Sequence, residues 1–163
     1  LLDWAPVIVW ACAIFFFSTD EFSSPNTSQI LTPLLTWLFP GISPAAIEIV
    51  HEAVRKFGHW FEYFILSALL LRVLLNENSD QPAWRNFLWT LMLIFLYAAG
   101  DEFHQSFVPS RTASIYDVMI DLCGGICGTL GMVLYHARTE SVRSLPQTVE
   151  SPAPNTSLGR KKT

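Results

Sequence analysis

Four stretches of the chain are almost continuously apolar, at residues 1–17, 57–75, 86–103 and 114–135. Each stretch is close to the roughly 20 residues that a helix needs to cross a lipid bilayer. Lipid offers the backbone no hydrogen-bond partners, so a chain that crosses it is expected to be helical there. The pattern therefore predicts an all-α, polytopic membrane protein with four transmembrane helices in an antiparallel bundle.

The segment between the first two stretches is apolar but interrupted by the helix-breaking residues Pro33, Pro40, Gly41 and Pro44. It is too broken to span a membrane. We predict a short interfacial or re-entrant helical segment over residues 30–39, and a short amphipathic helix over 45–55 that starts at Pro44. The second transmembrane helix then begins near Lys56. The first apolar stretch has neither a basic leading region nor a small-residue cleavage pattern after it, which predicts a retained membrane helix.

Beyond residue 138 the chain is rich in Ser, Pro, Thr and Asn. Such a composition cannot bury enough apolar surface to offset the entropy that is lost when a chain becomes ordered. We therefore predict two regions, a transmembrane domain over residues 1–138 and a disordered cytoplasmic tail over residues 139–163.

The overall composition agrees with a membrane location. Hydrophobic residues make up 51% of the chain and charged residues only 15%, where about 25% is usual for a soluble domain. This balance argues against a soluble enzyme. The formal net charge is −4, and the one basic cluster lies at the extreme end of the chain. We therefore expect no nucleic-acid partner.

The distribution of Lys and Arg predicts the orientation, because these residues favour the cytoplasmic side of a membrane helix. Seven of them flank the second loop or lie in the tail, namely Arg72, Arg85, Arg138, Arg143, Arg160, Lys161 and Lys162. The opposite side carries three, namely Arg55, Lys56 and Arg111. We therefore predict a multi-pass protein of the cytoplasmic (inner) membrane with both termini in the cytoplasm, so that residues 18–55 and 101–111 face outward.

Ionisable residues interrupt the apolar stretches mainly at this outer end. They are Lys56, His59 and Glu62 on the second helix, Asp101 and His104 on the third, Asp117 and Asp121 on the fourth, and Arg111 in the turn between the last two helices. Residues three or four positions apart share one face of a helix, so these side chains are expected to converge in one outward-facing polar pocket.

The free-energy cost of burying a charge in a membrane indicates that these residues have partners. An ionisable side chain at the centre of a membrane helix costs about 2.5 to 3.5 kcal/mol on insertion scales. Glu62 and Asp121 lie well inside their predicted helices and should therefore be paired. The alternatives for the partner are Lys56, Arg111, a histidine or a bound cation.

Small residues follow the two acids of the fourth helix. Gly124 and Gly128 are four positions apart, a spacing that lets the backbone of a neighbouring helix approach closely. We therefore expect another helix, with its polar residues, to pack near Asp117 and Asp121.

Three motifs contain these polar residues. They are residues 55–64 (RKFGHWFEYF), the string Asp101-Glu102-Phe103-His104-Gln105 with Phe107-Val108-Pro109 and Arg111 after it, and Asp117-Val118-Met119 to Asp121 with Gly124-Gly125 and Gly128 after it. In these motifs the chain resembles the VanZ-like membrane protein family over about residues 1–135. Ser110 stands where a Gly is common in that family, which changes the turn slightly but not the charge pattern.

The resemblance implies four helices with polar residues at the outer face. For the founding member of the family it also implies a link to resistance against the glycopeptide antibiotic teicoplanin. The family brings no settled reaction with it, so only the residues themselves indicate the chemistry of the pocket.

Binding a divalent metal is one function that the residues of the pocket suit. The available ligands are His59, Glu62, Asp101, Glu102, His104, Asp117 and Asp121. Imidazole and carboxylate together suit Zn, Mn or Mg, and the excess of carboxylates favours the harder ions. The alternative without chemistry is a buried ion-pair network, in which Lys56 and Arg111 neutralise the acids and hold the helices in register.

A metal-free catalytic site is the other use. Lys56 and Arg111, with Gln105, would bind a phosphate or carboxylate. His59 or His104 would be the general base, oriented by Glu62 or Asp101, with Asp117 and Asp121 in the same catalytic set. The expected substrate is a membrane lipid or a lipid-linked cell-wall precursor. As a protein without turnover, the chain would present the same pocket to a glycopeptide, a lipid or a protein partner.

Overall fold

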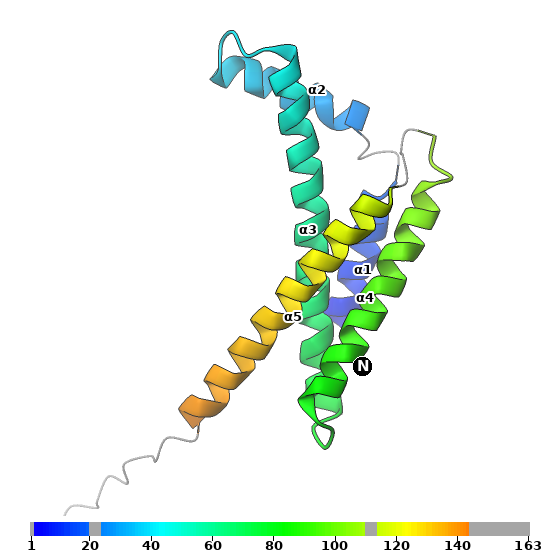
Figure 1. Cartoon of the computed structure of the whole chain (residues 1–163), viewed down its shortest axis with the longest axis vertical. Coiled ribbons are helices and arrows are strands. Elements are labelled where there is room, and N and C mark those ends of the chain that lie inside the picture. The colour runs from blue at the N-terminus through cyan, green and yellow to red at the C-terminus, as the bar shows by residue number, and fades with distance from the viewer. Residues whose placement is uncertain (1, 20–23, 110–113, 144–163) are drawn as a thin grey trace, which may run out of the picture.

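The computed structural model describes residues 2–19, 24–109 and 114–143, and within these ranges the chain forms five α-helices and no strand. The helices are α1 (Ala5–Phe17), α2 (Ser24–Leu38), α3 (Pro44–Glu77), α4 (Ala83–Gln105) and α5 (Ile115–Arg143). Helices α1, α3, α4 and α5 form a bundle, and α2 lies beside the N-terminal end of α3, beyond that bundle (Figure 1). The predicted all-α class is confirmed.

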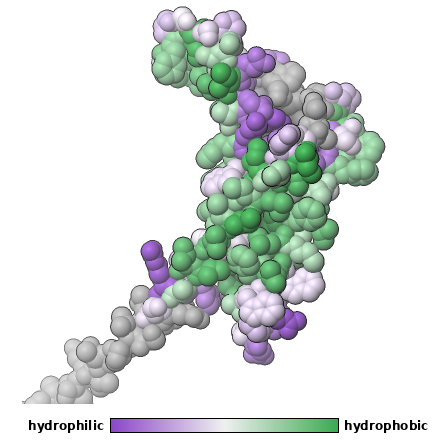
Figure 2. All heavy atoms as spheres, viewed as in Figure 1, coloured by the Kyte–Doolittle hydropathy of each residue, from purple (hydrophilic) through white to green (hydrophobic). Residues whose placement is uncertain are grey.

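The helices of the bundle carry apolar residues on their outer surfaces. On the face that Figure 2 shows, a continuous hydrophobic zone covers the middle of the molecule, with polar residues gathered beyond both of its ends. In the described part of the chain, α3 and the Ile115–Thr139 part of α5 are long and apolar enough to cross a membrane, while α1 is a shorter apolar helix. Exposed apolar side chains on α4 and α5 include Phe95, Leu96, Ile126 and Leu130.

Helix α3 differs from the prediction because it is one continuous helix. The amphipathic helix expected over residues 45–55 and the transmembrane helix expected from Lys56 are joined without a break. Ser43 caps the N-terminus by accepting a hydrogen bond from the backbone N–H of Ala46 (3.2 Å), and Pro44 occupies the first turn. No Pro occurs in the rest of α3, and Gly58, which only lowers helix propensity, does not end the helix before Glu77.

The predicted interfacial segment is also longer than expected. Helix α2 begins at Ser24 and contains Pro33 in its interior. Thr32 Oγ1 lies 3.1 Å from His51 Nε2, which ties α2 to the outer part of α3. Between the two helices, Gly41 has a φ of 95°, a left-handed conformation that Gly adopts without strain.

Helices α3 and α5 form the closest pair in the bundle and run in the same direction (Figure 1). Gly124 faces the backbone carbonyl of Trp60, and Gly128 faces that of Phe64, so closely that a Cβ atom at either glycine would overlap the carbonyl oxygen. The close approach expected from the spacing of these two glycines is therefore confirmed.

Helix α1 packs against the bundle through side chains that donate to backbone carbonyls. Trp10 Nε1 donates to the carbonyl of Glu62 (2.9 Å), and the Tyr97 hydroxyl donates to that of Ala11 (2.6 Å). Val7 and Ile14 of α1 belong to the apolar core. This packing carries the C-terminal end of α1 to the end of the bundle where α4 ends and α5 begins (Figure 1).

Helix α5 extends past the boundary that we predicted at residue 138. It continues to Arg143, so the first residues assigned to the disordered tail are helical. Residues 144–163 lie outside the described residues.

Candidate functional site

The packing of α5 on α3 aligns two pairs of polar residues. Arg55 and His59 are four positions apart on α3, and Asp117 and Asp121 have the same separation on α5. Because the helices are parallel and held close by Gly124 and Gly128, each acid of α5 lies opposite one basic residue of α3. Equal spacing on two parallel helices therefore builds this part of the site.

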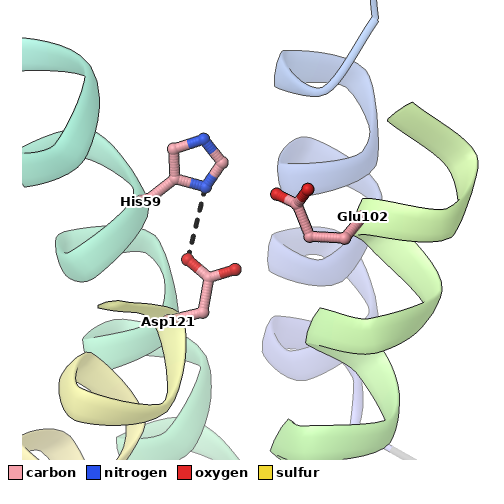
Figure 3. A group of neighbouring side chains, drawn as sticks. All are labelled: His59, Glu102 and Asp121. Carbon is pink, nitrogen blue, oxygen red and sulfur yellow. Dashed lines mark ion pairs between the residues drawn. The ribbon is translucent and has the colours of Figure 1, made fainter. Parts of the chain in front are cut away.

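His59 and Asp121 form the inner pair, and Glu102 of α4 completes a cluster of three. The Nδ1 atom of His59 lies 3.3 Å from Oδ1 of Asp121. Figure 3 shows the Glu102 carboxylate facing these two side chains from the opposite helix. One ligand atom from each residue lies within 4.8 Å of the others. The exposed fractions are 7% for His59, 5% for Glu102 and 0% for Asp121.

Several polar atoms of this cluster lack hydrogen bonds. Among the described residues, nothing donates a hydrogen bond to either oxygen of Asp121 or to Oε1 of Glu102. The hydroxyl of Tyr63, one turn further along α3 than His59, is also buried without a partner in the described part. Buried polar atoms normally have partners, so an arrangement like this one is suited to a bound ion, water or reacting group.

The other oxygen of Glu102 has a structural role. Oε2 accepts a hydrogen bond from the backbone N–H of Ser114 (2.8 Å), just before the first residue of α5. A helix N-terminus leaves backbone N–H groups without intrahelical partners and favours negative charge. Glu102 is therefore positioned by the start of α5, with its remaining oxygen directed to His59 and Asp121 (Figure 3).

Arg55 and Asp117 form the outer pair. Arg55 Nη1 donates to Asp117 Oδ2 at 2.8 Å, and its Nη2 donates to Glu52 at 3.0 Å. Lys56, which we predicted to share the pocket with His59, instead pairs with Glu52 at 3.1 Å and has 45% of its side chain exposed. Of the neighbouring cations Arg55 and Lys56, the one that reaches a buried acid is thus Arg55, and Lys56 lies at the rim.

Asp101 belongs to a separate network on the α1 side of α4. Its Oδ2 accepts hydrogen bonds from the Ser18 hydroxyl (2.8 Å) and from Gln105 Nε2 (3.0 Å). All three side chains are buried. Gln105, predicted to bind substrate, therefore contacts Asp101 and Ser18, and the network joins the end of α1 to the end of α4.

His104 also faces α1 and not the cluster around His59. Its ring lies 4.7 Å from the ring of Phe15, measured between centroids. A cavity of about 170 Å³ lies beside it, lined by Phe15, Leu96, Tyr97, Gly100, Asp101 and His104. The predicted pair of Asp101 and His104 is thus found together, but on the opposite side of α4 from Glu102.

The two remaining predicted site residues are placed less centrally. Glu62 is partly buried and lies outside the cluster of His59, Glu102 and Asp121. Arg111 lies outside the described residues. The single predicted pocket is therefore divided into three adjoining groups: the inner cluster, the Arg55 and Asp117 pair, and the network of Ser18, Asp101 and Gln105.

Sequence reasoning did not assign a site role to Arg55, Ser18 or Tyr63. Arg55 could have been found, because its separation from His59 equals that of Asp117 from Asp121. Tyr63 continues the same series by one more turn. Ser18 carried no comparable signal, since it looked like the first residue of a polar turn.

Comparison with known proteins bears on the family of the chain. No curated protein and no solved structure matches the chain. A family model described as VanZ/LLP1 matches residues 4–136, which contain the inner cluster and both adjoining groups. Together with the two apolar helices, the match indicates a membrane protein. The chain therefore belongs to the VanZ/LLP1 family, as its motifs predicted.

Proposed function

We propose that α1, α3, α4 and α5 each cross the cytoplasmic membrane, with both termini in the cytoplasm and the cluster of His59, Glu102 and Asp121 toward the outer face. The hydrophobic zone in Figure 2 supports a transmembrane bundle. The excess of Lys and Arg around the second loop and in the tail supports this orientation. Residues 1–138 then form the transmembrane domain, and the tail lies in the cytoplasm.

The site acts in cell-envelope chemistry, on a lipid-linked or cell-wall phosphate substrate. The observation that carries this proposal is the buried inner cluster, whose polar atoms lack hydrogen bonds from the described residues. A purely structural ion pair gains stability only when its geometry is good and its remaining polar atoms are bonded. The Arg55 and Asp117 pair approaches that condition, with a hydrogen bond of 2.8 Å, whereas the inner cluster does not.

The residues divide into roles by their charge and by the contacts that they make. Lys56, at the rim, and Arg111 attract the phosphate, since both carry fixed positive charge. The ion-pair contact between Asp121 and Nδ1 of His59 (3.3 Å) leaves Nε2 to take or give a proton at the substrate. Asp117 and Gln105 act as positioning residues, because the first holds Arg55 and the second holds Asp101. Asp101 and His104 line the adjoining cavity, and Glu62 supports the charge on His59.

A second candidate function is binding without turnover, of a glycopeptide, a lipid or a protein partner. The network of Ser18, Asp101 and Gln105 favours it, because its hydrogen bonds join the end of α1 to the end of α4. Either function is consistent with reduced sensitivity to teicoplanin-type antibiotics.

A resistance assay tests the role of the inner cluster. We expect expression of the chain in a teicoplanin-susceptible bacterium to raise the inhibitory concentration. His59→Gln and Asp121→Asn should remove that increase, while the membrane abundance of the variants stays within about twofold of the parent. These replacements are similar in size to the original side chains. They therefore remove the charge and the capacity for proton transfer while largely preserving the packing.

Glu52→Gln is the matched control, because Glu52 is an exposed acid outside the inner cluster. It should keep full resistance. If the two cluster variants lose resistance only in proportion to a loss of abundance, the cluster is structural and the proposed function fails.

Cysteine labelling tests the topology. After Cys12, Cys123 and Cys127 are replaced by Ser, single cysteines are introduced at Ser106 and Asp80, which are exposed beyond opposite ends of α4. A membrane-impermeant maleimide added to intact spheroplasts should label position 106 and not position 80. Permeabilised cells should label both. Labelling of position 80 alone in intact cells would reverse the proposed orientation.

A further inference from the structure

We infer that His59, Glu102 and Asp121 bind a divalent transition-metal cation, of which Zn²⁺ and Mn²⁺ suit the ligands best. The three ligand atoms lie within 4.8 Å of one another. Two ligands of a tetrahedral ion, each at about 2.1 Å from it, are roughly 3.4 Å apart. Small side-chain movements would therefore bring the three atoms onto one ion.

The burial of the cluster separates it from ordinary acidic surfaces. Each of the three residues is more than nine-tenths buried. Both Asp121 oxygens and Oε1 of Glu102 receive no hydrogen bond from the described residues, and Figure 3 shows them directed into the space between the helices. Unpartnered carboxylate oxygens that converge on a buried imidazole are the donor atoms that such a cation requires.

The charge of the cluster also points to a dication. With His59 neutral, as a metal ligand must be, the two ionised carboxylates carry two negative charges. The described cations nearby are already engaged, since Arg55 pairs with Asp117 and Glu52, and Lys56 pairs with Glu52. A divalent ion would neutralise the two charges inside the bundle, where an uncompensated charge is costly.

The donor set selects among ions. Imidazole suits transition metals and not Mg²⁺, whereas the two carboxylates allow Mn²⁺ as well as Zn²⁺. Three protein ligands also leave a coordination position open, as in catalytic zinc sites. With the ion bound, His59 would be a ligand and would not take a proton, so the ion would replace the role proposed above for His59. The inference does not depend on the substrate.

Metal content measures the site directly. The full chain is purified in detergent with its affinity tag removed, stripped with chelator, and dialysed against Zn²⁺ or Mn²⁺ followed by metal-free buffer. We expect about one ion per chain for at least one of the two metals by mass spectrometry. Asp121→Asn and Glu102→Gln should each reduce the retained metal at least tenfold, and Glu52→Gln should retain it fully.

Thermal unfolding provides a second readout that needs no activity assay. The metal should raise the unfolding midpoint of the parent and of Glu52→Gln by about 5 °C, and should not raise that of the cluster variants. If Asp121→Asn does not fold, His59→Gln replaces it in both measurements. A folded parent that retains neither ion, or cluster variants that retain as much as the parent, would overturn the inference. Cluster variants that lose the metal but keep resistance would count against the proposed function only.

Discussion

Replacing Gly128 with Leu is expected to destabilise the folded protein by about 3 kcal/mol or more, the upper end of what overpacking costs. The reason is that even a Cβ at this position would overlap the Phe64 carbonyl and the Ser67 hydroxyl of α3. A backbone carbonyl cannot rotate away as the end of a side chain can. The helices must therefore separate, and the inner cluster is lost with their packing. Thermal unfolding in detergent and elution volume on gel filtration would measure the effect.

Gly131→Ala is the matched control, one turn further along α5. A Cβ there would meet only the end of the Phe64 ring, at 3.9 Å, which is ordinary contact. Ala also has the higher helix propensity, by about 1 kcal/mol in water. We therefore expect stability equal to or slightly above that of the parent. If Gly128→Leu and Gly131→Ala were equally stable, α3 and α5 would not pack through this face.

The same glycines show why part of the fold is readable in the sequence. The spacing of Gly124 and Gly128 predicts close packing because it depends only on helix periodicity and residue size. The apolar stretches predict helices for a similar reason, since lipid leaves the backbone no other choice. The ends of the helices are harder to predict from the sequence. Residues 44–77 look like two helices because their composition changes near Lys56. Backbone continuity depends mainly on the absence of Pro, however, and the one weak helix former there, Gly58, is accommodated within the helix.

The site was harder to predict because sequence spacing identifies a helix face but not the neighbour that it meets. The sequence did predict the end of the bundle at which the polar residues gather. It also predicted the pairing of Asp121 with a histidine, as one of several alternatives. The sequence did not predict that polar residues of α4 contact two different helices. Asp101 and Glu102 are adjacent in sequence and therefore point about 100° apart on a helix. One reaches Ser18 of α1 and the other reaches α5, a difference that depends on tertiary packing.

The Arg55 and Asp117 pair should respond asymmetrically to the loss of either partner. The side chain of Asp117 is only 2% exposed, whereas that of Arg55 is 27% exposed and also bound to Glu52. Arg55→Met would leave a buried carboxylate without its cation, which we expect to cost about 3 kcal/mol, the lower end of the range for broken buried pairs. The start of α5 favours a negative charge and offsets part of the loss. Asp117→Asn would leave Arg55 with Glu52 and water, at a cost of about 1 kcal/mol.

The double variant Arg55→Met with Asp117→Asn decides whether buried charge is the cause. Removing the carboxylate from the Arg55→Met protein should restore stability, because the uncompensated charge disappears with it. We therefore expect the double variant to be more stable than Arg55→Met by about 2 kcal/mol, which makes the coupling energy of the pair about 3 kcal/mol, the upper end of the range for residues in contact. Unfolding of all four proteins in the same detergent measures the cycle. Equal costs for the two single variants, with additive behaviour in the double variant, would show that solvent or another cation compensates Asp117, and that Arg55 is not what neutralises it.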